Sequence, residues 1–290
     1  MVQITALREP EPGPSSYRLA WVATGADGHP VGLAYLRVPT AMGAEHRAEA
    51  EIQVHPAERR QGTGSALLAA AVDAARGLGR RAVTTGPVTG DAPFLVAHGF
   101  RPVLNLTFSR LPLTEAVAPR MATLAEESHP GYRLHSWEGT VAGDLAPTFA
   151  ASRRAMDDMP MDETDVAAEV WDVERVRAIA AAVTKRGDIL CTVAAMHEAD
   201  GTIVGFSELV VPGDGVGDAQ HYGTGVLPAH RGQGLARWMK ATAVQHVQDA
   251  HPRIGGLLTD TADSNVTMRR INDSLGYEPT HRSVLWQLDL

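Results

Sequence analysis

The sequence predicts an α/β (α+β) fold made of two tandem copies of one domain. A short glycine-rich segment occurs twice, and each half of the chain alternates strand patterns with helical ones around it. The chain has 290 residues, of which 44% are hydrophobic. Such a chain can build a sizeable core, in one large domain or in two of about 100–150 residues.

The internal repeat rests on two matched segments that occur in the same order. The segment VHPAERRQGTG at 54–64 aligns without a gap with VLPAHRGQGLA at 226–236. Further on, HGFRP at 98–102 aligns with LGYEP at 275–279, and the offset grows from 172 to 177 residues. Two ordered matches that differ by a short insertion indicate a duplication rather than chance.

These matches also predict the domain boundaries. The first copy is expected to end at Leu113 and the second at Leu290, each thirteen residues after the aromatic residue of its second match. Residues 114–131 are polar and lack sustained periodicity, which predicts a linker. We therefore expect an N-terminal domain over 1–113 and a C-terminal domain over 132–290.

Each copy is predicted to contain a hairpin, a third strand, a helix after the glycine-rich segment, another strand, a second helix and a closing strand pair. In the first copy, strands are expected at 17–24, 30–38 and 82–85, and a further strand is expected to end at Val54. In the second copy, strands are expected at 132–137, 189–197, 203–211 and 256–261, and a further strand is expected to end at Val226. Residues 144–156 and 172–184 have helical periodicity. The first copy has only a short stretch rich in Pro, Gly and Ser at the corresponding place, so it is expected to lack these two helices.

Composition excludes several classes of function. The 34 acidic and 26 basic residues give a net charge of −8, which argues against nonspecific nucleic-acid binding. No apolar run reaches the ~18–20 residues that span a bilayer, and the N-terminus does not resemble a secretory signal. The single cysteine, Cys191, lies in an apolar run and is expected to be a small core residue. We expect a cytoplasmic monomer or homodimer without membrane or nucleic-acid partners.

The segment RGQGLA at 231–236 lies between a predicted strand and a predicted helix. Its glycines allow a tight turn with several N–H groups facing one concavity, and the helix adds unpaired donors and its positive dipole end. This arrangement suits a pyrophosphate. The spacing matches neither the dinucleotide fingerprint G-x-G-x-x-G nor the nucleotide-triphosphate loop G-x-x-x-x-G-K-[ST].

Both turns resemble the Arg/Gln-x-x-Gly-x-Gly/Ala signature of the GNAT superfamily of N-acetyltransferases. The matching residues are Arg59, Gly62 and Gly64 in the first copy and Arg231, Gly234 and Ala236 in the second. A Val-x-Pro segment precedes each turn, and a Gly-aromatic pair follows it. The stretch 265–277 is similar to that of a tandem GNAT subgroup common in actinobacteria. The resemblance implies two tandem GNAT folds, each a mixed, mostly antiparallel twisted sheet flanked by helices.

The resemblance further implies acetyl-CoA (coenzyme A) as the cofactor and transfer of the acyl group to a primary amine of a small molecule by direct attack. The pantetheine would lie between two splayed parallel strands and bond to the backbone of the strand before the turn. The implied cofactor-binding residues of the second copy are Gly225, Val226, Leu227, Arg231, Gly232, Gln233, Gly234, Leu235, Ala236 and Asn265. Those of the first copy are Val54, Arg59, Arg60, Gln61, Gly62, Thr63, Gly64 and Ser65.

The family's usual catalytic acid is missing from both copies. GNAT enzymes frequently use a tyrosine four residues before the glycine of the Gly-aromatic pair, and here those positions hold Leu95 and Asn272. Neither side chain can give up a proton. Asn272 can hydrogen-bond near the cofactor sulfur or can serve as a structural residue of the helix.

A catalytic base is expected on the strand before the turn. The candidates are His221 and Tyr222, with Glu208 on the neighbouring strand. A strand histidine is more often structural, and Tyr222 equally fits a core or pocket-wall aromatic. In the first copy this strand carries Glu49 and Glu51, which better fit the solvated face of a strand.

The acceptor pocket of this fold lies beside the two helices that only the second copy is predicted to have. The loop 156–163 between them carries four carboxylates among methionines. Asp157, Asp158 and Met159 are predicted to attract a cationic amine and to pack its apolar part, although these acids also fit ordinary helix caps. The second copy is therefore expected to be the working one, whereas the first stabilises the assembly or still binds coenzyme A.

Two other functions stay open on the sequence alone. One is acetylation of a protein N-terminus or lysine, and the other is a non-catalytic module that binds or senses coenzyme A. No metal site is predicted, because the twelve histidines are scattered without an H-x₃-H pair beside an acid.

Overall fold

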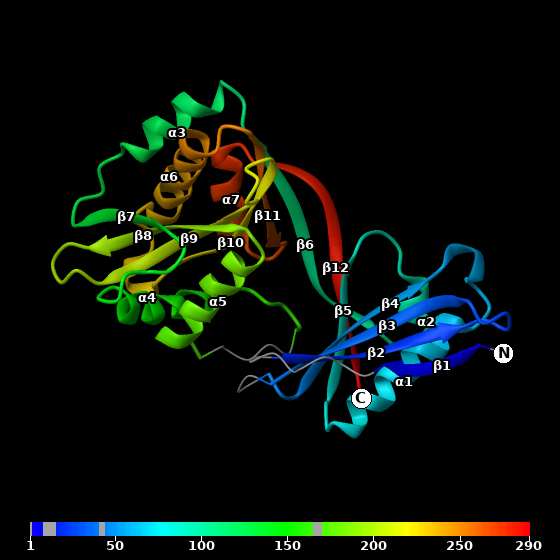
Figure 1. Ribbon diagram of the computed structural model, residues 1–290. Coiled ribbons are helices and arrows are strands. Elements are labelled where there is room, and N and C mark those ends of the chain that lie inside the picture. The colour runs from blue at the N-terminus through cyan, green and yellow to red at the C-terminus, as the bar shows by residue number, and fades with distance from the viewer. Residues whose placement is uncertain (1, 8–15, 41–43, 165–169) are drawn as a thin grey trace. The chain divides into compact units, whose positions relative to one another are not determined.

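A computed structural model describes residues 2–7, 16–40, 44–164 and 170–290, and the chain divides into two units (Figure 1). Unit 1 comprises residues 1–106, 161–169 and 282–290. Unit 2 comprises residues 107–160 and 170–281. The predicted candidate residues of the first glycine turn belong to unit 1, and those of the second turn belong to unit 2.

The sheet of unit 1 has the strand order β1-β2-β3-β4-β5-β12. Its strands are β1 (Gln3–Leu7), β2 (Ser16–Thr24), β3 (Pro30–Pro39), β4 (Arg47–Val54), β5 (Ala82–Val88) and the C-terminal part of β12 (Glu278–Asp289). Its helices are η1 (Pro56–Glu58), α1 (Thr63–Gly77) and α2 (Pro93–Ala97). Helix α1 packs on the sheet because Leu67, Leu68, Ala71, Val72 and Ala75 recur at helical spacing and are all buried.

The sheet of unit 2 has the strand order β6-β11-β10-β9-β8-β7. Its strands are β6 (Arg101–Pro112, from Thr107 onwards), β7 (Tyr132–Glu138), β8 (Ile189–His197), β9 (Ile203–Val211), β10 (Gly217–Val226) and β11 (Ile254–Ala262). Its helices are α3 (Val117–Ala125), α4 (Ala146–Ser152), η2 (Arg153–Met156), α5 (Val173–Lys185), η3 (Pro228–His230), α6 (Leu235–Ala250) and α7 (Val266–Leu275). Helix α6, with α3 beside it, covers one face of the sheet, and α4 and α5 lie on the other (Figure 1).

The predicted fold class is confirmed, because each unit combines helices with a mixed sheet. The pairs β4–β5 and β10–β11 are parallel, whereas the neighbouring hairpins are antiparallel. The two hairpins were predicted to within two residues, and the two predicted helices of the second copy are α4 with η2, and α5. In the first copy only residues 8–15, which lie outside the described part, separate β1 from β2.

The structure differs from the predicted elements in three places. The segment 114–131 is not a plain linker, because it contains α3, whose Met121 is fully buried. Strand β1 was not foreseen. Each copy closes with one continuous twelve-residue strand, β6 or β12, where a pair of strands was expected.

The closing strands are exchanged between the copies of the repeat. Residues 284–289 of β12 pair antiparallel with β5 of unit 1, although β12 follows the Gly-aromatic pair of the second copy. Residues 107–112 of β6 belong to unit 2, where β6 neighbours β11. The two units therefore differ in their residues from the predicted domains 1–113 and 132–290.

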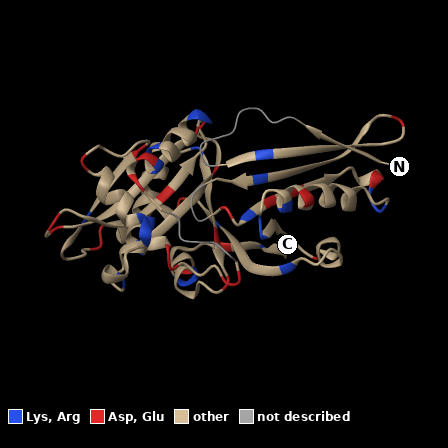
Figure 2. Ribbon diagram, turned by 90° about the horizontal axis from the view of Figure 1, so that it is seen from below, with Lys and Arg blue, Asp and Glu red and all other residues tan. Residues whose placement is uncertain are grey.

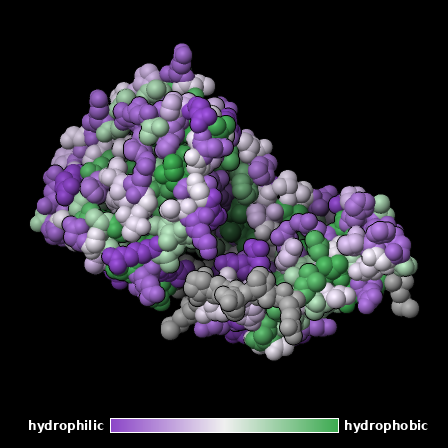
Figure 3. Space-filling view, in the orientation of Figure 1, coloured by the Kyte–Doolittle hydropathy of each residue, from purple (hydrophilic) through white to green (hydrophobic). Residues whose placement is uncertain are grey.

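Acidic and basic residues are interspersed along the ribbon (Figure 2), and hydrophilic and hydrophobic residues are mixed on the visible face (Figure 3). Among the helices of the described residues, none combines the length and the apolar character needed to cross a membrane.

Candidate active site

The two glycine turns begin with nearly the same backbone geometry. Arg59 follows η1 with φ −72° and ψ 160°, and Arg231 follows η3 with φ −72° and ψ 164°. Nε of Arg59 donates to the carbonyl of Val54 at 3.2 Å, and Nε of Arg231 donates to that of Val226 at 2.8 Å. In both copies the signature arginine therefore ties the turn to the end of the preceding strand.

The N-cap of the helix after each turn is a glycine with left-handed backbone, whereas Arg60, at the position of Gly232, is left-handed without being glycine. Gly62 (φ 86°) and Gly234 (φ 76°) are the N-caps of α1 and α6, and Gly232 also has a positive φ of 78°. The first N–H groups of each helix have no acceptor within the helix. A Cβ built on Gly62 or Gly232 would meet no non-neighbouring atom within 4 Å, so each turn has open space beside one of its glycines, although the ring of His129 lies beside Gly234. The residues present thus fit the pyrophosphate of a coenzyme A.

The parallel strands before each turn diverge along their length. Strands β10 and β11 pair as far as Gln220, opposite Leu258, and β4 and β5 pair as far as Glu49, opposite Thr84. The pairing of β10 with β9 shifts register between His221 and Gly223, which marks a bulge. The equivalent pairing of β4 with β3 keeps one register throughout. Such a bulge redirects side chains and frees backbone groups from the ladder.

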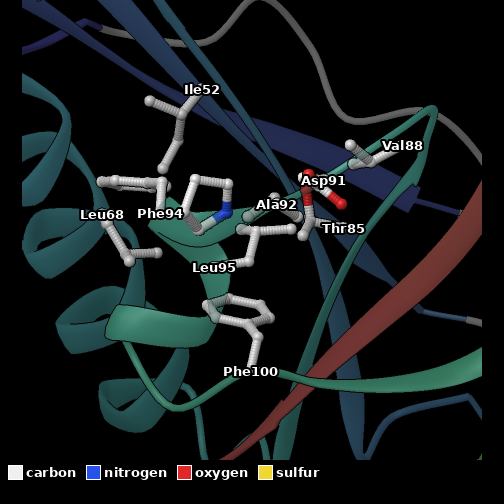
Figure 4. Close-up of a pocket in the computed structure, with 11 residues that line it drawn as sticks. Ile52, Leu68, Thr85, Val88, Asp91, Ala92, Phe94, Leu95 and Phe100 are labelled. Carbon is white, nitrogen blue, oxygen red and sulfur yellow. The ribbon is translucent and has the colours of Figure 1, made fainter.

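In unit 1 the diverging strands border a pocket of about 280 Å³ (Figure 4). It is lined by Ala50, Ile52, Leu68, Thr85, Val88, Asp91, Ala92, Pro93, Phe94, Leu95 and Phe100. Thr85 and Asp91 contribute the only polar side chains of this lining, and neither Glu49 nor Glu51 belongs to it. The pocket is therefore an apolar slot rather than a catalytic constellation.

A buried polar cluster lies beside the bulge of β10. Nε2 of His221 lies 2.5 Å from Oη of Tyr277, and both residues are buried. Lys240 of α6 is 1% exposed, and its Nζ lies 5.0 Å from the centre of the Tyr277 ring. Burial lowers the pKa of Lys240 to about 7. Burial is the main cause that holds the pKa of His221 well below its ordinary value, and the charge of Lys240 lowers it further. His221 is therefore neutral at pH 7.

Sequence reasoning missed Lys240 and the role of Tyr277. Tyr277 was recognised only as half of the Gly-aromatic pair. The signal for Lys240 was its spacing, since Lys240, Val244 and Val247 lie at i, i+4 and i+7 on the buried face of α6.

Glu208, predicted as a possible base, lies in a buried ion pair. Its Oε1 is 2.5 Å from Nη2 of Arg153, and both side chains are almost fully buried. The Arg153 guanidinium also stacks over the rings of Phe149, Trp171 and Phe206, at 4.2 to 4.8 Å. The carboxylate therefore serves to neutralise the buried Arg153 cation.

The other two catalytic candidates have different surroundings. Asn272 of α7 is buried and donates from Nδ2 to Oγ1 of Thr261 at 3.1 Å, whereas its Oδ1 has no hydrogen-bond partner among the described residues. Tyr222 is 49% exposed, so it is not a core aromatic. Asn265 caps α7, because its Oδ1 accepts a hydrogen bond from the Met268 amide at 3.1 Å.

The predicted acceptor residues lie next to the second turn. Asp158 forms a bidentate pair with Arg231, with distances of 2.6 and 2.7 Å. The guanidinium lowers the pKa of the Asp158 carboxyl and compensates its charge, which weakens its predicted attraction for a cationic acceptor. Asp157 and Met159 are exposed.

The segment predicted as a linker also contacts the second turn. Nδ1 of His129 lies 2.9 Å from the carbonyl oxygen of Gln233, and the His129 ring stacks on Trp238 of α6 at 4.3 Å. A Cβ on Gly234 would lie 3.0 Å from the His129 ring. This turn is therefore supported by a contact that the repeat alone did not predict.

Comparison with known proteins agrees with this arrangement. The acetyltransferase (GNAT) family matches the chain over residues 6–100 and 154–277. The mycothiol acetyltransferase of Thermomonospora curvata is 29% identical over 263 residues, covering 90% of this chain and 80% of its own. That of Sanguibacter keddieii is 29% identical over 239 residues, covering 78% and 70%.

Solved structures show the same tandem architecture. A tandem GNAT protein from the clavulanic acid biosynthesis pathway has a TM-score of 0.73 and 25% identity, covering 96% of this chain and 84% of its own. A GCN5-related N-acetyltransferase from Sphaerobacter thermophilus, at 18% identity and a TM-score of 0.64 over 93% and 80%, shares the fold. With one family match in each half, the chain belongs to the acetyltransferase (GNAT) family and is an acetyltransferase of the tandem type.

Proposed function

We propose that the chain is an acetyl-CoA-dependent N-acetyltransferase that acts on a primary amine of a small molecule, and that its second copy performs the transfer. The observation that carries this proposal is the bulge of β10 at His221–Gly223, beside the buried His221–Tyr277 pair. The first copy has the same turn and the same diverging strands, but its β4 keeps a regular register.

Acetyl-CoA would supply the acyl group as a thioester. The residues that would hold it are the backbone of 232–236 for the pyrophosphate and the end of β10 for the pantetheine. The glycine conformations and the open space beside Gly232 support this assignment. A backbone N–H freed by the bulge suits the developing oxyanion, because a fixed donor there needs no reorganisation during the reaction.

The amine must lose a proton as it attacks the thioester. His221 stays neutral at physiological pH and can accept a hydrogen bond, while Tyr277 fixes the orientation of its ring. Lys240 is too deeply buried to touch a substrate, and we assign it the role of a positioning residue that sets the local charge.

The acceptor would approach from the α4–η2 side of the sheet. A Cβ on Gly225 would lie 3.0 Å from Cβ of Ala155 and 3.2 Å from Sδ of Met156, so η2 packs directly against β10. This packing places Met156 beside the strand that would hold the pantetheine. The mycothiol acetyltransferase names of relatives from Thermomonospora curvata and Sanguibacter keddieii support a small-molecule acceptor.

We propose that the first copy binds coenzyme A but does not transfer the acyl group. Its apolar pocket and intact turn suit a pantetheine-bearing ligand, yet the lining has neither a histidine nor a lysine. Coenzyme A bound there would stabilise the chain by mass action without contributing to turnover.

The test is incubation of the full chain with acetyl-CoA and a panel of small primary amines, with release of free thiol as the readout. The proposal expects amine-dependent thiol release and an acetylated product. Tight coenzyme A binding without turnover on any amine would instead favour a non-catalytic binding module. Turnover on peptides but not on small amines would favour a protein acetyltransferase.

A further inference from the structure

A second group of chemically reactive side chains lies at the other end of α6 from the glycine turn. Glu138 ends the edge strand β7, and Cys191 lies directly opposite it on β8. His246 lies in the last turns of α6, and His251 is the C-cap of that helix. With a rise of about 1.5 Å per residue, this group is roughly 20 Å from the start of α6.

The four side chains converge on one carboxylate oxygen. Oε1 of Glu138 is 3.7 Å from Sγ of Cys191, 3.6 Å from Nε2 of His251 and 3.1 Å from Nε2 of His246. The ligand atoms of Glu138, Cys191 and His251 all lie within 4.8 Å of one another.

The separations of 3.6 and 3.7 Å from Oε1 of Glu138 to Nε2 of His251 and Sγ of Cys191 are close to the edges of a tetrahedral zinc site. Zinc binds sulfur at about 2.3 Å and nitrogen or oxygen at about 2.0–2.2 Å, which places neighbouring ligand atoms roughly 3.4–3.6 Å apart. A thiolate, a carboxylate and imidazoles are also the donors that zinc prefers.

The group is poorly satisfied by protein contacts alone. Cys191 is 3% exposed, and the buried Nε2 of His251 makes no hydrogen bond among the described residues, since its contact with Oε1 of Glu138 is 3.6 Å long. A buried nitrogen without a hydrogen bond calls for an explanation, and a bound ion is one of the usual ones.

We propose that Glu138, Cys191 and His251 bind one Zn²⁺ ion, and that the partly exposed His246 ring turns from Oε1 of Glu138 toward the ion to become the fourth ligand. On binding, the Cys191 thiol releases its proton to solvent and the sulfur donates an electron pair to zinc. The thiolate and the carboxylate then balance the two positive charges, and both imidazoles bind as neutral ligands. With four protein ligands the site is structural, and it ties the edge strand β7 and β8 to the end of α6.

This inference departs from the expectation of no metal site. His246 and His251 are five residues apart, so they lack the H-x₃-H spacing, and the other two ligands come from strands far away in the sequence. Only the pairing of β7 with β8 brings Glu138 opposite Cys191.

The test is a titration of the chelator-treated full-length protein with Co²⁺, followed by displacement with Zn²⁺. The proposal expects one equivalent of Co²⁺, with the visible bands of tetrahedral cobalt and a thiolate-to-cobalt charge-transfer band in the near ultraviolet. Zn²⁺ should abolish both signals and raise the Tm. Failure of the wild-type protein to bind stoichiometric Co²⁺ would overturn the proposal.

Substitutions of the proposed ligands test which side chains bind the metal ion. Cys191→Ser should lose the charge-transfer band, and His251→Ala should weaken Co²⁺ binding at least about tenfold. The matched control is His197→Ala, since His197 also pairs with a carboxylate, Asp200, at 3.2 Å, and it should change neither signal. Glu138→Gln serves as a second variant if either of the first two fails to fold by circular dichroism. An unchanged spectrum in Cys191→Ser, or equal loss in His197→Ala, would also contradict the site.

Discussion

His221 and Tyr277 form a buried hydrogen bond of 2.5 Å that joins the bulged strand β10 to the residue after the Gly276 turn of α7. The corresponding aromatic residue of the first copy is Phe100, which has no hydroxyl group, and the position matching His221 is Glu49. The polar pair thus belongs to the second copy alone. It is the main chemical difference between two otherwise similar cofactor turns.

Tyr277→Phe is expected to lower kcat by about tenfold or more, which corresponds to ~1.4 kcal/mol of transition-state free energy. The change leaves Nε2 of His221 without its partner and lets the imidazole rotate. Initial rates of thiol release at saturating and at sub-saturating acetyl-CoA concentrations separate kcat from KM. A purely structural hydroxyl would lower the Tm while leaving kcat of the folded fraction unchanged.

Lys240→Met is expected to remove a pH dependence of stability. Burial lowers the pKa of Lys240 from 10.5 to about 7, so between these values the unfolded chain binds a proton that the folded chain does not. Stability of the wild-type protein therefore rises with pH in this window, by up to ~1.4 kcal/mol per pH unit. Urea unfolding at pH 7 and pH 9 checks this: the rise should shrink in Lys240→Met, and an equal rise in both proteins would refute the assignment.

Arg231→Lys is expected to weaken acetyl-CoA binding to the second copy by about tenfold. Lysine cannot keep both the hydrogen bond to the Val226 carbonyl and the bidentate ion pair with Asp158. The matched variant is Arg59→Lys, which disturbs the equivalent bond in the first copy. Calorimetric titration and the KM for acetyl-CoA report the effect. Equal increases of KM in both variants would mean that the turns do not differ in function.

Glu208→Gln is expected to destabilise the fold by about 3–5 kcal/mol, since it leaves the Arg153 charge buried and unpaired. The double change Arg153→Met with Glu208→Leu should cost much less, because no charge then remains in the core. Denaturant unfolding measures both. Full stability of Glu208→Gln together with lost activity would restore Glu208 as a catalytic base.

The repeat, the hairpins and the two glycine turns were predictable because each leaves a local pattern of fixed spacing. The strand exchange was not, because β6 and β12 carry equivalent patterns that fit either sheet. Helix α3 was missed although Val117, Met121 and Leu124 lie at i, i+4 and i+7, since they are surrounded by polar residues. The pairing of Asp158 with Arg231 joins residues 73 positions apart, and no local pattern announces such a contact.

The measurement that tests the central claim most directly compares thiol release by Gly234→Glu and Gly62→Glu under identical conditions. Both glycines are left-handed N-caps of the helix after a glycine turn, so a glutamate adds the same negative charge and similar backbone strain to each, with an added contact to His129 at Gly234. If the second copy performs the transfer, amine-dependent thiol release is abolished in Gly234→Glu and retained in Gly62→Glu. Retained turnover in Gly234→Glu with loss in Gly62→Glu would contradict the account.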